Sequence, residues 1–313
     1  ALEDIFAVQE ELTRAIVGAI APQIESSEFR KLRGGRAKQL NSEEMAMRAR
    51  DMARQADKDA TQASHAGALR MAEDAVALDA ECGAALSTIA YLHWRRLWAS
   101  SGPQSPDEAK AGLDAARRAI DIDSSDHVAH LWKGMLLVYC DQPAAGLADL
   151  RRAHELNPND ALTLSLLGQI EAGAGHVESG IRHAQEALRL SPRDPMRWSY
   201  LNSLAWAYFA GDDLANAVAT ATLAAGEAPH FYPPHLCLAL SHAGLGATHA
   251  ATSEIKLAHT LAPQRVDDRA AGRWQLADSA IRLRASTLLH AVMEAAHLRT
   301  QAQPPQGSRA RAR

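Results

Sequence analysis

The sequence predicts an all-α protein built as a solenoid of stacked helix pairs. Three observations predict this fold class. Alanine is abundant while aromatic residues make up only 5% of the chain, almost no stretch alternates apolar and polar residues as a strand would, and one short segment recurs at a nearly regular interval. With 313 residues, the chain is long enough for two ordinary domains or for one extended array.

Composition and charge exclude several classes of protein. The chain has 33 lysines and arginines against 37 acidic residues and a net charge of -4, so it lacks the broad basic surface of a nucleic-acid binder. Cys82, Cys140 and Cys237 are scattered singly, which indicates neither a disulfide framework nor a structural zinc site. The longest apolar runs span about seven residues, far fewer than the ~20 that cross a bilayer. We therefore expect a soluble, cytoplasmic protein with no nucleic-acid or membrane partner.

An eight-residue segment that begins with alanine organises most of the chain. It occurs six times, for example as AHELNPND from Ala153 and ALRLSPRD from Ala187, and the leading alanines are spaced 44, 34, 34, 37 and 34 residues apart. In the last four copies a proline follows five residues after the alanine; these prolines are Pro158, Pro192, Pro229 and Pro263. Because proline cannot continue a helix, each one predicts where the second helix of a unit ends.

Small residues recur at fixed distances before each proline. The positions 24 residues before it are Gly134, Gly168, Ala205 and Ala239, and the positions 12 residues before it are Gly146, Gly180, Ala217 and Ala251. Larger apolar residues stand between them. The pattern predicts two antiparallel helices that pack at close range in every unit.

This arrangement resembles the tetratricopeptide repeat, with which it shares a period of 34 residues and the positions of the small residues. The resemblance implies a right-handed α-solenoid of about six helix-turn-helix units within residues 37–264. The units fall at about 43–80, 83–124, 127–158, 161–192, 198–229 and 232–263. The first unit is degenerate, since Ala80 replaces its proline.

Both ends of the array carry additional segments. In residues 1–36, apolar residues at helical spacing predict an amphipathic linker helix, followed by a basic, glycine-containing hinge at Arg30–Arg36. Residues 265–299 show a second apolar face, which predicts one capping helix over the last unit. Residues 300–313 are rich in Pro, Gln, Ser and Arg, and we expect them to be disordered.

The segment DIFAVQEELTRAIVGAIAP, which begins at Asp4, resembles the linker that precedes the repeats in a group of bacterial signalling proteins. In that group an adenylate or guanylate cyclase domain, or a winged-helix DNA-binding domain, comes before the repeat array. The phrase ALRLSPRDPMRWSYLNSLAWAYFAGD, from Ala187, is also similar to the repeats of that group. The resemblance implies that this chain is the C-terminal regulatory part of such a protein.

The sequence contains no phosphate-binding loop of the GxxxxGK[ST] type and no GxSxG nucleophile motif. Two histidine pairs, His127 with His130 and His235 with His242, have spacings that allow them to share a helix face, but neither has the carboxylate or HExxH context of a metal site. We expect solvated or capping histidines there, and no metal, cofactor or catalytic site.

In tetratricopeptide arrays the first helices of the units line a concave groove, and the resemblance implies which side chains point into it. Aromatic rings supply contact area in such a groove, and amides can hydrogen-bond a peptide backbone. The candidate groove residues are Tyr91, Trp94 and Arg95 in the second unit, Leu131, Met135 and Tyr139 in the third, Ser165 and Gln169 in the fourth, and Asn202, Trp206 and Phe209 in the fifth. The lysine and asparagine set that holds C-terminal carboxylates in heat-shock co-chaperones is not matched.

The leading hypothesis is therefore a non-catalytic interaction module whose groove binds a protein or peptide, with self-association as a further expectation. Two alternatives remain open: a free-standing adaptor without an output domain, and a helical-repeat transferase or hydrolase whose site the sequence does not reveal. The repeat predicts the fold more firmly than the partner, because one fold serves many functions.

Overall fold

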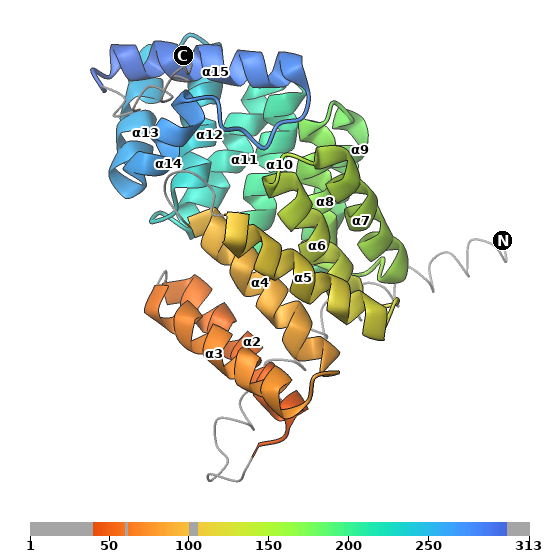
Figure 1. Ribbon diagram of the computed structural model, residues 1–313. Coiled ribbons are helices and arrows are strands. Elements are labelled where there is room, and N and C mark those ends of the chain that lie inside the picture. Colours follow the sequence, from red (N-terminus) through yellow and green to blue (C-terminus); the bar gives the residue numbers. More distant parts are fainter. Residues whose placement is uncertain (1–39, 60–61, 100–105, 299–313) are drawn as a thin grey trace, which may run out of the picture.

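The computed structural model describes residues 40–59, 62–99 and 106–298, and these residues form helices with no strand. The predicted linker helix in residues 1–36 and the predicted disordered tail at 300–313 lie outside the described residues. Successive helix pairs lie side by side in a curved stack that runs from α2 to α15 (Figure 1). The prediction of an all-α solenoid is confirmed.

Six consecutive pairs of antiparallel helices make up the array. The first helices of the pairs are α2 (Ser42–Asp59), α4 (Gly83–Ala99), α6 (His127–Tyr139), α8 (Ala161–Gly173), α10 (Arg197–Ala210) and α12 (Tyr232–Gly244). The second helices are α3 (Gln62–Leu78), α5 (Pro106–Ile122), α7 (Pro143–Leu156), α9 (Val177–Leu190), α11 (Leu214–Glu227) and α13 (Thr248–Leu261). The degenerate first unit thus forms a helix pair like the others.

The small residues of the repeat lie where the two helices of a unit cross. A Cβ atom on Gly134 of α6 would lie 2.8 Å from the carbonyl oxygen of Gly146 of α7, and one on Gly146 would lie 2.6 Å from that of Gly134. Gly168 of α8 and Gly180 of α9 face each other in the same way. Buried alanines take the corresponding positions in the next two units. Backbones approach this closely only where the side chain is absent or very small.

Capping residues and prolines set the helix boundaries. Asp126, Asp160 and Asp213 accept hydrogen bonds from main-chain N–H groups in the first turns of α6, α8 and α11. These N–H groups have no partner within the helix, so the caps stabilise the helix starts. Pro158 and Pro192 stand two residues after the last residues of α7 and α9. The prolines of the repeat therefore mark the ends of second helices, as predicted.

The C-terminal region differs from the single capping helix predicted for residues 265–299. The structure has two helices there, α14 (Pro263–Ala270) and α15 (Ser279–Ala295). Gly272, with a φ of +83°, follows the end of α14, and the Asp278 side chain caps the start of α15. These two residues interrupt a segment whose apolar residues otherwise recur at helical spacing.

The connection between α14 and α15 crosses back over the array. The main-chain N–H of Asp278 donates to the carbonyl oxygen of Gly173, at the end of α8, at 2.9 Å. Helix α15 then packs against α12 and α13 and covers the end of the stack (Figure 1). The C-terminal residues thus contact the middle of the array as well as its last unit.

The curvature of the array brings distant helices together. The rings of Trp98, near the end of α4, and Tyr232, at the start of α12, lie 6.4 Å apart between centroids. Two large clusters of buried apolar side chains run through the stack, one from α2 to α8 and the other from α10 to α15. Among the described residues, no helix combines the length and the apolar character that crossing a membrane requires.

Candidate binding groove

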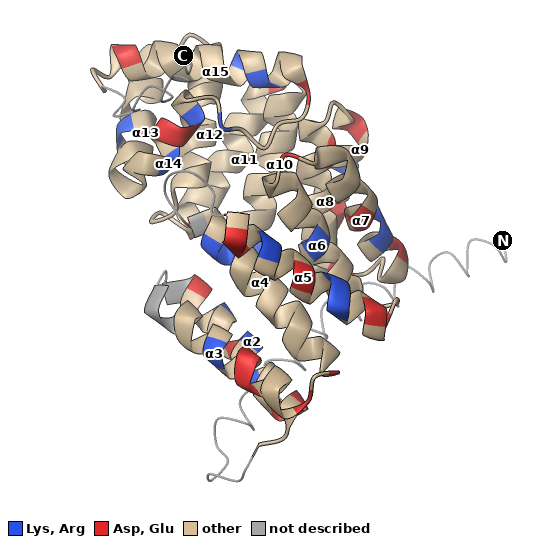
Figure 2. Ribbon diagram, viewed as in Figure 1, with Lys and Arg blue, Asp and Glu red and all other residues tan. Residues whose placement is uncertain are grey.

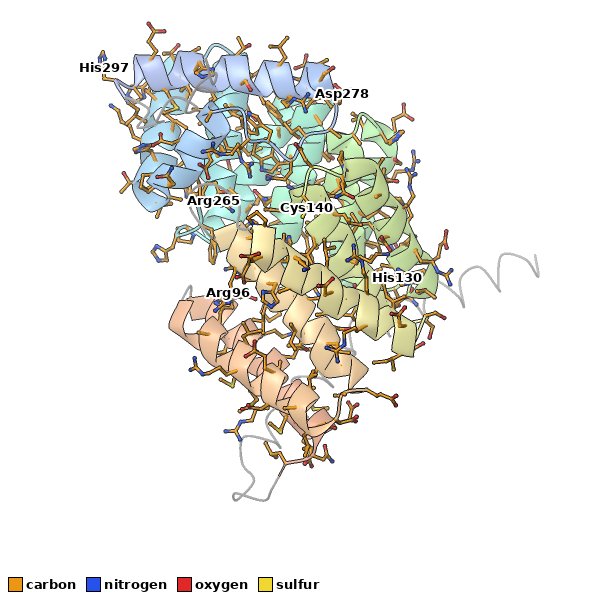
Figure 3. The ribbon with its side chains drawn as sticks, viewed as in Figure 1. Arg96, His130, Cys140, Arg265, Asp278 and His297 are labelled. Carbon is orange, nitrogen blue, oxygen red and sulfur yellow. The ribbon has the colours of Figure 1, made fainter. Side chains whose placement is uncertain are left out.

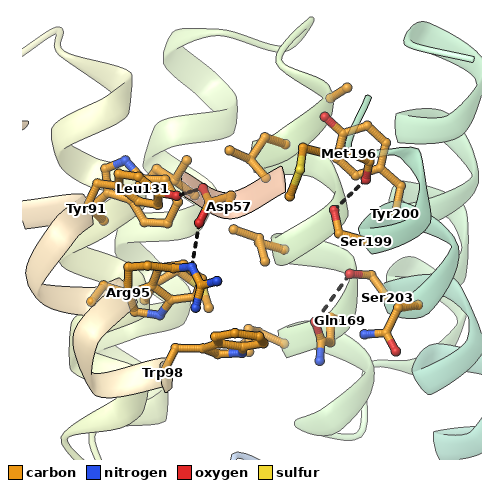
Figure 4. Close-up of a pocket in the computed structure, with 18 of the residues that line it drawn as sticks. Asp57, Tyr91, Arg95, Trp98, Leu131, Gln169, Met196, Ser199, Tyr200 and Ser203 are labelled. Carbon is orange, nitrogen blue, oxygen red and sulfur yellow. Dashed lines mark hydrogen bonds and ion pairs between the residues drawn. The ribbon is translucent and has the colours of Figure 1, made fainter. Parts of the chain in front are cut away.

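A groove of about 760 Å³ follows the concave side of the array. The first helices of all six units line it, and Arg269 of α14 and Trp274 of the following connection also contribute. Figure 4 shows Tyr91 and Arg95 of α4 on one side of this space and Gln169 of α8 on the other. The groove is therefore assembled from residues that are far apart in the sequence.

All six tryptophans of the chain line this groove, as do four of its five tyrosines. The ring centroid of Trp132 lies 4.6 Å from that of Tyr91 and 4.9 Å from that of Trp94. Tyr139 meets Trp94 edge-on at 6.2 Å. Because aromatic residues make up only 5% of the chain, this concentration does not follow from overall composition. Such rings supply large contact areas and are enriched where proteins bind partners.

Nine of the eleven candidate groove residues line the groove. They are Tyr91, Trp94, Arg95, Leu131, Met135, Tyr139, Gln169, Asn202 and Trp206. All nine belong to first helices of the units. Within each helix, most of them are three, four or eight residues apart, and this spacing places them on one face.

Phe209 and Ser165 lie in the protein interior instead. Phe209 is fully buried, and the guanidinium of Arg284 from α15 stacks over its ring at 5.1 Å. The ring belongs to the cluster of buried side chains that runs from α10 to α15, and Arg284 also donates to the carbonyl oxygen of Ala210 at 3.0 Å. Ser165 is 1% exposed and donates to the hydroxyl of Ser203 at 3.0 Å, in the contact between α8 and α10. These contacts show that neither side chain lines the groove, contrary to the prediction.

The groove also uses aromatic residues that sequence reasoning missed. Trp98 lies one turn after Trp94 on α4, so its i, i+4 spacing could have indicated the same face. Tyr232 stands at the start of α12, where the repeat pattern predicts no groove position. Trp274 belongs to the region after the last repeat, and no local pattern predicts that this region folds back toward the groove.

A buried carboxylate, that of Asp57 on α2, joins the N-terminal helices at the groove. Its oxygens accept hydrogen bonds from the Tyr91 hydroxyl, from Arg95 Nε at 2.6 Å and from His65 Nε2 at 2.8 Å. Burial raises the pKa of Asp57, but the His65 hydrogen bond and the Arg95 charge outweigh burial and lower it. The Arg95 guanidinium also lies over Trp98 at 4.2 Å. Arg95 is thus neutralised and held against the aromatic cluster (Figure 4).

The side of the groove formed by α8 and α10 is more polar. The Ser203 hydroxyl donates to Gln169 Oε1 at 3.2 Å. Asn202 Oδ1 is buried and has no hydrogen-bond partner among the described residues, and the same holds for the indole N–H groups of Trp94 and Trp274. Asn159 Oδ1, in another residue that lines the groove, is a fourth such atom. Since buried polar atoms normally have partners, two donors and two acceptors are left unsatisfied at the groove.

His130 and His235, expected to be solvated or capping, are buried and bonded to carboxylates. His130 Nδ1 lies 2.9 Å from Asp149 Oδ1, and His235 Nδ1 lies 2.7 Å from Glu254 Oε2. Each pair links the two helices of one unit, and His130 is labelled in Figure 3. The residues that the structure describes contain no group of three or more side chains placed to hold a metal ion.

The three thiols are not activated. Burial raises the pKa of Cys237 to about 12 and also raises the pKa of Cys82 and Cys140 above the ordinary value. A cysteine nucleophile requires a lowered pKa, because the thiolate is the reactive form. These residues therefore contribute to packing.

No protein-family profile and no curated protein matches the chain. Among solved structures, it resembles the human IFIT1 dimer with m7Gppp-AAAA, with a TM-score of 0.61 and 14% identity over 83% of this chain and 60% of that one. It also resembles a chain of the APC/C hetero-tetramer Cut9-Hcn1, with a TM-score of 0.56 and 17% identity over 73% of this chain and 39% of that one. A third structure is PilW, a type IV pilus biogenesis factor, with a TM-score of 0.50 and 16% identity over 67% of this chain and 92% of that one.

The chain thus spans less than two thirds of the IFIT1 and Cut9-Hcn1 chains that it resembles. At these identities the likeness concerns the fold. Together with the six helix pairs and their small-residue contacts, it identifies the architecture as an α-solenoid of the tetratricopeptide type.

Proposed function

We propose that this chain is a non-catalytic interaction module whose groove binds an extended segment of a partner protein. The observation that carries the proposal is the convergence of all six tryptophans on one groove. Residues that dominate the binding energy of protein interfaces are enriched in Trp, Tyr and Arg, and the groove combines all three. A rigid aromatic surface also loses little conformational entropy on binding.

The four buried polar atoms of groove residues that lack partners favour an extended segment over a helix. The Oδ1 atoms of Asn159 and Asn202 require donors, and the indole N–H groups of Trp94 and Trp274 require acceptors. An extended main chain presents free N–H and C=O groups, whereas a helix uses these groups internally. A bound helix would leave the groove atoms unsatisfied, at about 1–3 kcal/mol for each.

The charge of the groove favours a polypeptide over a nucleic acid. The human IFIT1 structure is a complex with m7Gppp-AAAA, but the groove of this chain balances four arginines with four aspartates. Both signs of charge are also interspersed over the visible outer helices (Figure 2). Binding of a polyanion depends on an excess of positive charge, which the groove as a whole does not have.

The sequence resemblance supports a wider context for this module. The segment from Asp4 is similar to the linker of bacterial proteins that carry a cyclase or winged-helix domain before the repeats. In that context the array is a cytoplasmic regulatory part, and a peptide in the groove signals the presence of a partner to the output domain. Self-association of the array is a second route to the same regulation.

Intrinsic fluorescence tests the proposal directly, because every tryptophan of the chain lines the groove. Peptides that bind the purified protein are selected from a library of short random peptides with amidated C termini. Enriched peptides should change the tryptophan emission on titration, and proline placed within them should be tolerated at several positions, since an extended chain accommodates it. Peptides that bind without changing the emission, or only as helices, would contradict the proposal.

A further inference from the structure

Helix α14 carries a buried arginine with unsatisfied donors. Arg265 is 8% exposed, and its Nε and Nη2 atoms have no hydrogen-bond partner within the described residues. Its neighbour is Tyr139 at the end of α6, which lines the groove; burial raises the pKa of the Tyr139 hydroxyl, and the nearby Arg265 charge partly offsets this. Arg265 is labelled in Figure 3. Burial of an unpaired charge is strongly unfavourable, so this arrangement indicates a missing counter-charge.

Arg269, one turn further along α14, lines the groove itself. Its guanidinium lies over Trp274, with 5.6 Å between the guanidinium carbon and the ring centroid. One of its nitrogens donates to the carbonyl oxygen of Arg273. The Trp274 ring and the Arg273 carbonyl thus orient the guanidinium of Arg269. Neither of them neutralises its positive charge.

The carboxylates nearest in sequence form no ion pair with Arg265 or Arg269. Asp268 pairs with Arg273. Asp267 Oδ1 lies 3.6 Å from His259 Nε2 and has no hydrogen-bond partner among the described residues. Arg95, which lines the same groove, is by contrast neutralised by a buried aspartate at 2.6 Å. Within the described residues, neither Arg265 nor Arg269 forms an ion pair with a carboxylate, and Arg269 therefore lines the groove without a direct counter-charge.

We propose that Arg269, backed by the buried Arg265, binds the side-chain carboxylate of an acidic residue in the peptide. This inference rests on the proposed function and adds the chemistry of the ligand. A carboxylate fits the guanidinium fork through two parallel, charge-assisted hydrogen bonds. It also offsets the charge of Arg265, because Coulomb attraction acts strongly in a partly desolvated site. The groove then selects an extended segment with Asp or Glu at one defined position.

The location of α14 favours a side chain of the peptide over its C-terminal end. The connection after α14 follows the C-terminal ends of two first helices: the Trp274 ring lies 6.2 Å from that of Trp206 on α10, and Asp278 bonds Gly173 on α8. Arg269 therefore belongs to a wall beside the floor of the groove. A peptide that lies along the floor directs side chains toward this wall while its main chain continues past it.

The test compares the peptide preferences of the wild-type chain with those of charge variants. From random peptides with amidated C termini, the wild type should enrich Asp or Glu at one position by about five- to tenfold. Arg269→Glu should abolish this preference and favour Lys or Arg there. Arg269→Lys keeps the charge without the fork, so a weaker acidic preference should remain. Arg152→Glu, on the exposed face of α7, is the control and should select the same peptides as the wild type.

The outcomes separate this inference from the function on which it rests. Peptides that change the tryptophan emission but show no acidic preference would overturn the inference and leave the function in place. If Arg152→Glu lost the acidic preference to the same extent as Arg269→Glu, the preference would reflect overall charge, and the inference would also be overturned. Loss of binding by the amidated peptides, with binding restored when the same peptides carry a free C-terminal carboxylate, would show recognition of a chain end and would overturn the inference. The absence of any groove-binding peptide would overturn both. Circular dichroism checks folding, and Arg269→Gln serves if Arg269→Glu does not fold.

Discussion

Gly168 and Gly180 lie so close across the contact between α8 and α9 that a Cβ on Gly168 would stand 2.6 Å from the carbonyl oxygen of Gly180. The reciprocal distance, from a Cβ on Gly180 to the carbonyl oxygen of Gly168, is 2.5 Å. Both distances are too short for non-bonded atoms, and the obstacle is backbone in each case. The fourth unit therefore tolerates no side chain at either position without separation of its two helices.

Gly168→Ala should lower the free energy of unfolding by about 1–3 kcal/mol, because the added methyl group overpacks this contact. Gly226→Ala is the matched control, since a Cβ on Gly226 of α11 meets nothing within 4 Å. That variant should gain up to about 1 kcal/mol from the better helix propensity of alanine. Urea unfolding followed by circular dichroism measures both changes. Equal stability of Gly168→Ala and the wild type would show that the helices are further apart.

Glu171 of α8 links stability to pH. It accepts hydrogen bonds from His183 Nδ1 at 2.8 Å and Arg151 Nη2 at 3.0 Å. Burial raises the pKa of Glu171, but these hydrogen bonds outweigh burial and lower it from 4.5 to about 2. Since the folded-state pKa is lower than the unfolded one, the stabilisation is fully present above about pH 4.5 and is lost as the pH falls toward 2.

Glu171→Gln should therefore destabilise the protein at neutral pH, by about 1–3 kcal/mol. The difference from the wild type should shrink as the pH falls, because the wild-type carboxylate becomes protonated. Urea unfolding at neutral pH and at several acidic values measures it. Glu155→Gln, in an exposed pair with Arg152, should change stability by less than about 1 kcal/mol. A difference between Glu171→Gln and the wild type that persists unchanged at low pH would count against this assignment.

Asp57→Asn should loosen the first unit, because it removes the counter-charge of the buried Arg95 and weakens the link to Tyr91. Breaking a buried ion pair by removing one partner costs about 3–5 kcal/mol. In a repeat array each unit contacts mainly its neighbours, so hydrogen exchange should accelerate in α2 and α3 and remain unchanged in α12 and α13. Asp114→Asn, in an exposed pair on α5, is the control. Uniform acceleration along the whole array would argue against a local role for Asp57.

Trp94→Ala and Trp206→Ala should each weaken binding of a selected peptide by about 1–3 kcal/mol, since truncation removes contact area in the groove. Both rings line the groove and are only partly buried, so the helical circular dichroism signal should stay intact. Leu283→Ala, at a side chain 69% exposed on α15, should leave affinity unchanged. Full retention of binding by both tryptophan variants would disprove the groove assignment. Unfolding of both would place the rings in the core instead.

The sequence by itself determined the repeat, its register and much of the groove. Gly168 and Gly180 mark a helix crossing because close backbone approach permits no larger side chain. Pro192 marks a helix end because proline lacks the N–H that a helix requires. Trp94 and Trp206 reach the groove because they stand on the inner face of first helices. These requirements are local, so the spacing of residues along the sequence reveals them.

Only the tertiary structure decided which inner positions stay open and what completes the groove. Phe209 lies in the core, within the cluster of buried side chains that runs from α10 to α15, and the Arg284 guanidinium of α15 lies over its ring. Trp274 and Arg269 reach the groove because the chain folds back from α14 to Gly173. Such contacts join residues far apart in the sequence, and their stability comes from burial of apolar surface, which is not directional. No local periodicity specifies where that surface is buried.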